Sequence, residues 1–216
     1  MILTAGRGER LRPLTETTPK ALTEVRGRSL LERHLDALQA AGVRTVVINL
    51  GWLGEQIADR VGSGAAYGLN VVYSPENEEI LETGGGIQRA LPLLGNDPFL
   101  VVNADIFTDM PMPESALDDN TLGKLVLVPT PQDKGKGDFD IVAGQLRNGE
   151  QPQYTFSGVA VYRPEFFAGC KPGRFSIAPM LRAAADADQL AASVYSGHWT
   201  DVGTVERLEA LNRHQD

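Results

Sequence analysis

A cation-rich loop near the beginning of the chain carries residues whose types and spacing suit phosphate chemistry. It spans residues 6–25 and follows a short apolar stretch. Its chemistry-bearing residues are Gly6, Arg7, Gly8, Arg10, Arg12 and Lys20. The glycines allow backbone N–H groups to approach phosphate oxygens, while guanidinium and ammonium groups neutralise a polyphosphate. The loop therefore predicts a phosphate cradle, with a solvated surface loop containing chance glycines as the alternative.

Two aspartates are the candidate metal ligands. Asp105 ends the apolar run FLVVNAD, and Asp201 lies in the segment HWTDVGT. Mg²⁺ is commonly held by one or two carboxylates together with substrate phosphates, so a carboxylate at a strand's carboxyl end beside a phosphate loop suits it. The alternative for Asp105 is an Asx turn that ends the strand, and Asp201 is open to the same two interpretations.

Two further segments offer contacts to a polar ligand. The segment LETGGG, residues 81–86, places three glycines before an expected helix, where a flat ligand could lie against bare backbone. Thr83 in this segment also fits a plain helix N-cap. The segment KGKGDFD places Lys134 and Lys136 beside Asp138. These charges suit a polar substrate, but a charged turn is the favoured interpretation.

The elements expected around these residues alternate between strands and helices. Residues 29–42 predict a helix, because leucines recur at helical spacing behind an S-x-x-E capping box. Strands are expected at residues 45–50 and 69–74, with a helix over residues 53–61 between them. This βαβαβ order predicts a parallel sheet.

The second half of the chain breaks this order. The pattern predicts a glycine-rich turn entering a helix at 83–95, strands at 99–107, 124–129, 138–149 and 156–163, and helices at 177–188 and 205–214. A hairpin turn is expected near Asn148 and Gly149, and the segment GHWTDVGT is expected to form a turn before the last helix. Because a hairpin interrupts the alternation, we expect a mixed sheet or an inserted β-layer.

Composition limits the class of protein. The 216 residues suffice for one α/β domain over 1–216 with a well-buried core. A net charge of −8 argues against a nucleic-acid or anionic-membrane partner. No apolar run is long enough for a bilayer span or a signal peptide, and the single Cys170 excludes an intrachain disulfide, so a cytoplasmic protein is expected.

The order of these motifs resembles that of the sugar-1-phosphate nucleotidyltransferases. The opening LTAGRGERLRPLTETTPKAL is similar to the family signature L-A-A-G-x-G-x-R-L-x-P-L-T followed by P-K, and the similarity continues through LETGGGI, VVNADIF and WTDVGT, over nearly the whole chain. The resemblance implies a Rossmann-like α/β fold, a three-layer sandwich around a mixed, mostly parallel sheet. It also implies Mg²⁺-dependent conversion of a nucleoside triphosphate and a sugar 1-phosphate into a nucleoside-diphosphate sugar and pyrophosphate.

The same resemblance implies roles for individual residues. Arg10 would bind the departing pyrophosphate and Lys20 would stabilise the α-phosphoryl group, while Asp105 and Asp201 would hold Mg²⁺. The nucleotide-binding positions are Leu3, Ala5, Gly6, Arg7, Gly8, Thr83, Gly84 and Asn103. The sugar-binding positions are Asp138 and Gly158.

The chain departs from the family pattern at a few positions. Thr4 and Ala104 replace a usual alanine and a usual glycine next to backbone, which we expect to be tolerated. The family's V-E-K-P segment, whose lysine meets the sugar phosphate, has no counterpart. Either Lys134 or Lys136 substitutes for that lysine, or Mg²⁺ and Lys20 hold the phosphate without it.

Within the family, the short length and segments such as VINLGWLGEQI and FSGVAVY favour a uridylyltransferase that uses UTP and an N-acetylated sugar 1-phosphate. Glucose or mannose 1-phosphate, phosphocholine and other nucleoside triphosphates are alternatives. A non-catalytic sugar-nucleotide sensor is disfavoured because the charged residues are all present. An NAD(P)-dependent oxidoreductase is disfavoured because the glycine motif is incomplete and Pro13 stands where a helix should begin. A monomer or small homo-oligomer is expected, because the extra elements that assemble larger relatives are missing.

Overall fold

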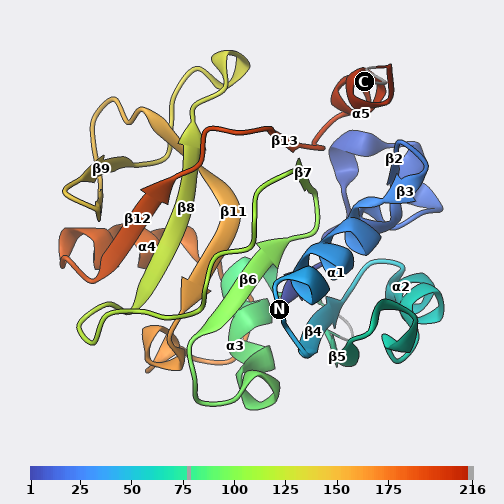
Figure 1. Cartoon of the computed structure of the whole chain (residues 1–216), viewed down its shortest axis with the longest axis horizontal. Coiled ribbons are helices and arrows are strands. Elements are labelled where there is room, and N and C mark those ends of the chain that lie inside the picture. Colours follow the sequence, from blue (N-terminus) through green and yellow to red (C-terminus); the bar gives the residue numbers. More distant parts are fainter. Residues whose placement is uncertain (77–78, 214–216) are drawn as a thin grey trace.

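Nine strands form the central sheet of the computed structural model, which describes residues 1–76 and 79–213 (Figure 1). In spatial order the strands are β5 (Asn70–Pro75), β4 (Thr45–Leu50), β1 (Ile2–Leu3), β6 (Phe99–Asn103), β11 (Tyr154–Tyr162), β8 (Gly123–Pro129), β12 (Leu190–Val194), β10 (Gln145–Arg147) and β9 (Asp140–Val142). The predicted βαβαβ unit is therefore confirmed, and it forms one half of the sheet.

The directions of the strands follow from the connections between them. The strands β5, β4, β1 and β6 pair in parallel, because α1 (Leu30–Ala40), α2 (Gly54–Val61) and α3 (Glu82–Leu94) each provide a crossover. In the other half, β11 runs antiparallel to both β6 and β8, while β12 runs parallel to β8. The expected mixed sheet is confirmed.

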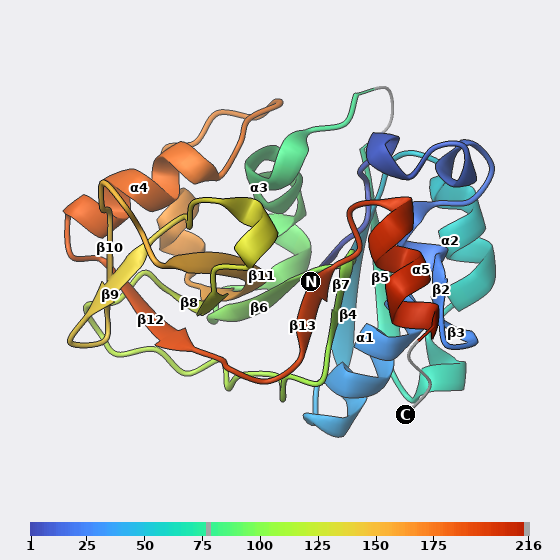
Figure 2. The same ribbon diagram turned by 90° about the horizontal axis from the view of Figure 1, so that it is seen from above.

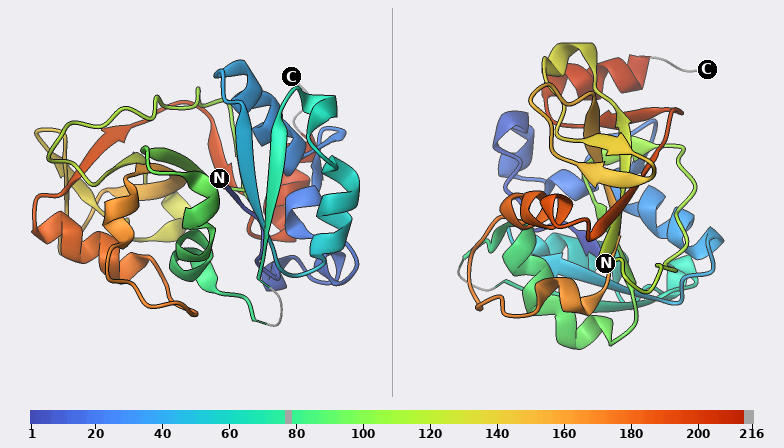
Figure 3. Two further views of the ribbon diagram at one scale, coloured as in Figure 1. Left: turned by 90° about the horizontal axis from the view of Figure 1, so that it is seen from below. Right: turned by 90° about the vertical axis from the view of Figure 1, so that its left-hand side faces the viewer.

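Helices cover both faces of the sheet, which makes the expected three-layer sandwich (Figures 2 and 3). Successive strand residues point to opposite faces. Val46 and Ile48 therefore join the apolar core beneath α1 and α2, whereas Val47 between them joins the core beneath α3 and α4 (Ala178–Asp186). The capping box that predicts α1 is present in the structure, with Ser29 and Glu32 bonded to each other's backbone N–H groups.

The last helix returns to the beginning of the chain. Helix α5 (Val205–Arg213) packs against the small β2 (Glu24–Val25) and β3 (Arg28–Ser29) hairpin through a core that includes Val25 and Leu211. The expected helix over 205–214 is confirmed up to Arg213, and residue 214 lies outside the described residues. Within the described ranges, no helix is both long and apolar enough to cross a membrane.

The predicted glycine-rich turn before α3 is wrong, because Gly84, Gly85 and Gly86 lie inside the helix. The helix N-cap is Leu81, so the N-cap interpretation of Thr83 is also wrong. The glycines serve close packing instead. A Cβ on Gly85 would lie 2.1 Å from the carbonyl oxygen of Gly173, and one on Gly84 would lie 2.4 Å from the ring of Phe175.

Two other turns differ from expectation. The strands β9 and β10 form a hairpin, but its turn is Ala143–Gly144 rather than Asn148–Gly149. Both Ala143 and Gly144 have positive φ, at 49° and 79°, as a two-residue type I′ turn requires. The expected turn GHWTDVGT contains a short strand, β13 (Trp199–Asp201), which pairs antiparallel with β7 (Ile106–Thr108).

The close packing of the α3 glycines allows us to predict the effect of a substitution on stability. Gly85→Ala should lower the free energy of unfolding by about 1–3 kcal/mol, because the added methyl group overlaps a backbone oxygen and outweighs the helix preference of alanine. Chemical denaturation of the variant and of Arg89→Ala, an exposed change in the same helix, provides the measurement and its control. A Gly85→Ala protein as stable as the Arg89→Ala control would contradict this account.

Candidate active site

The predicted site residues gather at one edge of the sheet, where the parallel strands β1, β4, β5 and β6 all end. This is the edge at which open α/β sheets bind ligands. Two adjoining pockets open there, and both are lined by Asn103 and Asp105. We refer to the one beside β1 and α3 as the first pocket and to the one beside β11 and β13 as the second pocket.

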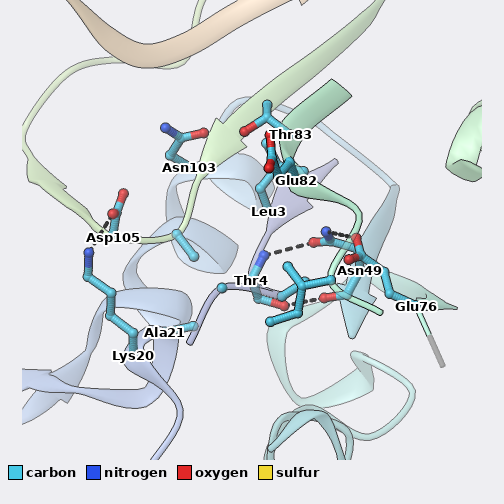
Figure 4. A pocket seen from close by; sticks show the side chains of 14 residues that line it. Leu3, Thr4, Lys20, Ala21, Asn49, Glu76, Glu82, Thr83, Asn103 and Asp105 are labelled. Carbon is cyan, nitrogen blue, oxygen red and sulfur yellow. Dashed lines mark hydrogen bonds and ion pairs between the residues drawn. The ribbon is translucent and has the colours of Figure 1, made fainter. Parts of the chain in front are cut away.

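The first pocket contains most of the residues predicted to bind a nucleotide (Figure 4). The predicted residues that line it are Leu3, Ala5, Gly6, Lys20, Thr83, Asn103 and Asp105. A Cβ on Gly6 would meet no heavy atom within 4 Å, so the space beside this part of the loop is open. The loop after β1 and the first turn of α3 therefore form facing walls of one cavity.

A buried hydrogen-bond network forms the floor of the first pocket. The side-chain oxygen of Asn49 accepts a bond from the Thr4 backbone N–H at 2.7 Å, and its amide group donates to Glu76 at 2.7 Å. The other carboxylate oxygen of Glu76 accepts from the Leu81 N–H at 2.7 Å. Because Asn49 and Glu76 are buried, these bonds fix the end of β1 and the entry to α3 relative to each other.

The sequence analysis missed Asn49 and Glu76. Both follow the same rule as Asp105, since Asn49 interrupts an apolar strand near its carboxyl end and Glu76 directly follows β5. A systematic reading of polar residues at strand ends would have found them.

A short ion pair joins the cationic loop to the strand end. The Lys20 Nζ lies 2.5 Å from Oδ2 of Asp105, with the lysine side chain 13% exposed and the aspartate 35% exposed. Lys20 begins the turn η3 (Lys20–Leu22) of the loop, and Gly8 packs against its side chain. Lysine ammonium and carboxylate thus meet where the two pockets join.

The β7–β13 ribbon brings the second predicted carboxylate to the first. Asp201 pairs with Ile106, the residue after Asp105, and the Val202 N–H donates to the Asp105 carbonyl oxygen at 2.7 Å. Asp105 and Asp201 both line the second pocket, together with the predicted residues Arg10 and Gly158. Gly158 has φ 84°, and a Cβ there would lie 2.8 Å from the Asn103 side chain, so a residue other than glycine would be strained and would displace Asn103.

Cations surround Asp201. Its carboxylate accepts a hydrogen bond from Arg207 in α5, whose second terminal nitrogen bonds Asp133 at 2.6 Å. The bond to Asp133 raises the pKa of the Arg207 guanidinium. A Cβ on Gly203 would lie 3.0 Å from Asp201 and 3.3 Å from Arg10, so both side chains lie close to this glycine. Sequence reasoning missed Arg207, because nothing in its local pattern links it to the site.

The donor set fits Mg²⁺. The described residues contain no group of three or more His, Cys, Asp or Glu side chains that would hold a metal ion by themselves. Two carboxylates that line one pocket are the number that Mg²⁺ takes when substrate phosphates and water complete its shell. The residues that would hold the ion are Asp105 and Asp201.

Four predicted site residues do not line either pocket. The Arg7 guanidinium stacks 4.8 Å over the ring of Trp52, Gly8 begins the turn after it, and Gly84 faces Phe175. Asp138 binds Lys134 at 2.7 Å and accepts from the Phe156 N–H at 2.9 Å. Lys134 and Phe156 themselves line the second pocket, so Asp138 supports its wall from behind. Lys136 is not among the lining residues of either pocket.

This fold and site agree with the family that the sequence matches. The chain belongs to the family of MobA-like NTP transferase domains, whose model matches residues 1–200. The expectation of a nucleotidyltransferase is thereby confirmed.

The names of two relatives give a substrate as well as the class of reaction. The chain is 46% identical over 220 residues to the N-acetylmuramate alpha-1-phosphate uridylyltransferase of Neisseria meningitidis serogroup B, covering 97% of this chain and 94% of that protein. It is 34% identical over 219 residues to the protein of the same name from Caulobacter vibrioides, covering 94% and 90%. The crystal structure of HddC from Yersinia pseudotuberculosis has the same fold, with a TM-score of 0.80, 23% identity, and coverage of 98% and 96%.

A buried histidine behind the β7–β13 ribbon allows us to predict how the stability of the protein depends on pH. His34 of α1 is buried, and burial lowers the pKa of its imidazole from 6.5 to about 4. Below pH 6.5 the unfolded chain takes up a proton that the folded protein does not, so stability falls as the pH drops toward 4. Between pH 7 and pH 4.5 wild type should lose about 2–3 kcal/mol more stability than His34→Gln.

Denaturant unfolding at a series of pH values measures this difference, and His198→Gln at an exposed position is the control. Equal losses for wild type and His34→Gln would show that His34 does not carry the effect.

Proposed function

We propose that this chain, as a single domain over residues 1–216, transfers a uridylyl group from UTP to N-acetylmuramate 1-phosphate and releases pyrophosphate. The observation that carries the proposal is the position of Lys20, Asp105 and Asp201 where the two pockets adjoin. Asp105 lines both pockets and pairs with Lys20 of the first pocket, while Asp201 lines the second pocket. The identity of 46% over almost the full length of a uridylyltransferase of that name supports the choice of substrates.

The reaction suits the groups present. A sugar phosphate is already an anionic nucleophile, so the site needs no general base; it must align two anions and neutralise the charge that develops. The first pocket holds the nucleotide, with Thr83 and Asn103 beside the base and sugar and Lys20 at the α-phosphoryl group. The second pocket holds the sugar phosphate, with Gly158 beside the sugar. Arg10 binds the departing pyrophosphate.

Mg²⁺ held by Asp105 and Asp201 would supply Lewis-acid stabilisation of the phosphoryl oxygens. Each of these carboxylates also has a cationic partner within the chain, Lys20 for Asp105 and Arg207 for Asp201. Lys20 lines the first pocket, so its ammonium group is placed for a phosphate oxygen of the nucleotide. The pair therefore keeps the lysine positioned and desolvated until substrate arrives.

The product of this reaction, a uridine-diphosphate N-acetylmuramate, places the enzyme in peptidoglycan recycling in the cytoplasm, where UTP is available. A monomer or a small homo-oligomer remains our prediction for its assembly.

A substrate panel tests the proposal. Pyrophosphate release would be measured with Mg²⁺ for UTP, dTTP, CTP, ATP and GTP against N-acetylmuramate, N-acetylglucosamine, glucose and mannose 1-phosphates and phosphocholine. We expect release only from UTP with N-acetylmuramate 1-phosphate. Release from another pair would retain the reaction and replace its substrates, while no release from any pair would favour a sugar-nucleotide sensor.

Replacement of Lys20 tests the role of the cationic loop. Lys20→Ala should lower kcat by about 10²–10³-fold, because it removes a charge that stabilises the transition state in a water-poor site. The exposed Lys171→Ala is the matched control and should keep wild-type kcat. Thermal unfolding completes the test: a Lys20→Ala protein that turns over normally but melts at a lower temperature would make Lys20 structural.

A further inference from the structure

One arginine connects opposite walls of the second pocket. Arg207 lies in α5 and binds Asp201 on the ribbon and Asp133 in the turn η5 (Gln132–Lys134). Pro131 and Lys134 of the η5 segment line the far wall of this pocket. Figure 1 shows the η5 turn in yellow and α5 in red at the same end of the molecule.

The two bonds of Arg207 differ in their surroundings. Asp201 is 31% exposed, and its ion pair with Arg207 lies at the pocket. Asp133 is 62% exposed, while the Arg207 side chain is 28% exposed. An ion pair to an exposed carboxylate contributes little to stability, because water screens it and the side chain loses entropy. The bond to Asp133 is thus the one that an incoming anion can replace.

The other cations of the second pocket are less available to a ligand. Lys134 is bound to Asp138, which is itself held by the Phe156 backbone. Arg10 lines the same pocket, and in the proposed function it binds the pyrophosphate. Arg207 offers the terminal nitrogen that now binds the exposed Asp133, and a phosphate oxygen can accept a charge-assisted hydrogen bond from this nitrogen.

We propose that Arg207 is the residue that binds the phosphate of the sugar 1-phosphate, exchanging Asp133 for a phosphate oxygen. This inference rests on the proposed function and names a cation for its second substrate. Asp201 holds one terminal nitrogen of the guanidinium group, Nη1, beside the pocket, and Asp133 holds the other, Nη2, until the sugar phosphate enters. Arg207 therefore determines the affinity for the sugar 1-phosphate and not the affinity for the nucleotide.

Steady-state kinetics of four variants test the assignment, with KM for UTP and KM for the sugar 1-phosphate measured separately. Arg207→Gln should raise KM for the sugar 1-phosphate about 10- to 100-fold and leave KM for UTP within about twofold, because the charge-assisted bond to the phosphate is lost. Arg207→Lys should recover part of this loss. Asp133→Asn should leave KM for the sugar 1-phosphate unchanged or lower it, since a competitor for Arg207 is weakened.

The control is Arg213→Gln, which removes an exposed arginine of the same helix that pairs with Glu209. Neither KM should change in this variant. Thermal unfolding of each variant accompanies the kinetics. If Arg207→Gln does not fold, Arg207→Lys decides the question through the same two KM values.

Three results would overturn the assignment. The first is an unchanged KM for the sugar 1-phosphate in Arg207→Gln when wild type is active. The second is an equal rise of both KM values, which would make Arg207 a general brace for Asp201. The third is a rise of KM for the sugar 1-phosphate in Asp133→Asn equal to that in Arg207→Gln, which would mean that the intact bridge matters. No turnover by wild type with any substrate pair would instead overturn the proposed function, and this inference with it.

Discussion

The hydrogen bonds of Asn49 determine where the first strand ends and the cationic loop begins. Strand β1 has only two residues, so its pairing with β4 and β6 positions little of the chain that follows. Asn49 extends that control by binding the Thr4 N–H, and the Trp52 N–H then binds the Ala5 carbonyl oxygen at 3.1 Å. The loop leaves the sheet in a defined direction as a result, and Lys20 can return to meet Asp105.

The second half of the site depends on a different device, the β7–β13 ribbon. It is not part of the large sheet, and its backbone pairing carries Asp201 back to the strand end that bears Asp105. The residues that follow enter α5, which brings Arg207 over the same pocket. One half of the site is thus made by parallel strands ending together, and the other half by a segment distant in sequence that pairs beside them.

The sequence predicts the elements of this structure that depend on residues close to one another along the chain. Apolar periodicity locates α1, α2 and the main strands, and the capping box fixes the start of α1. The same reasoning places Asp105 at a strand end. It fails at Gly84 to Gly86, because glycine favours turns over helices, and only the close approach of Gly173 and Phe175 explains why glycines stand inside the helix.

Tertiary partners account for the other failures. Asn49 and Glu76 have a role only through each other and through Thr4 and Leu81, which lie on separate segments. Arg207 resembles any charged residue of an exposed helix face until the ribbon places Asp201 beside it. Similarly, Ala143–Gly144 forms the hairpin turn because cross-strand pairing sets the register of β9 and β10, although Asn148–Gly149 has the better local turn sequence.

The ion pairs of the site have a consequence for selectivity in a phosphate-rich environment. Lys20 and Arg207 each already bind a carboxylate, so any anion that enters must compete with a tethered one at very high local concentration. Free inorganic phosphate brings no base or sugar contacts with which to offset that competition. In the proposed function a nucleotide or sugar phosphate gains such contacts from the walls formed by the first turn of α3 and by β11. In a chain whose net charge is −8, the carboxylates that pair with Lys20 and Arg207 thus reduce the binding of small anions to these cations.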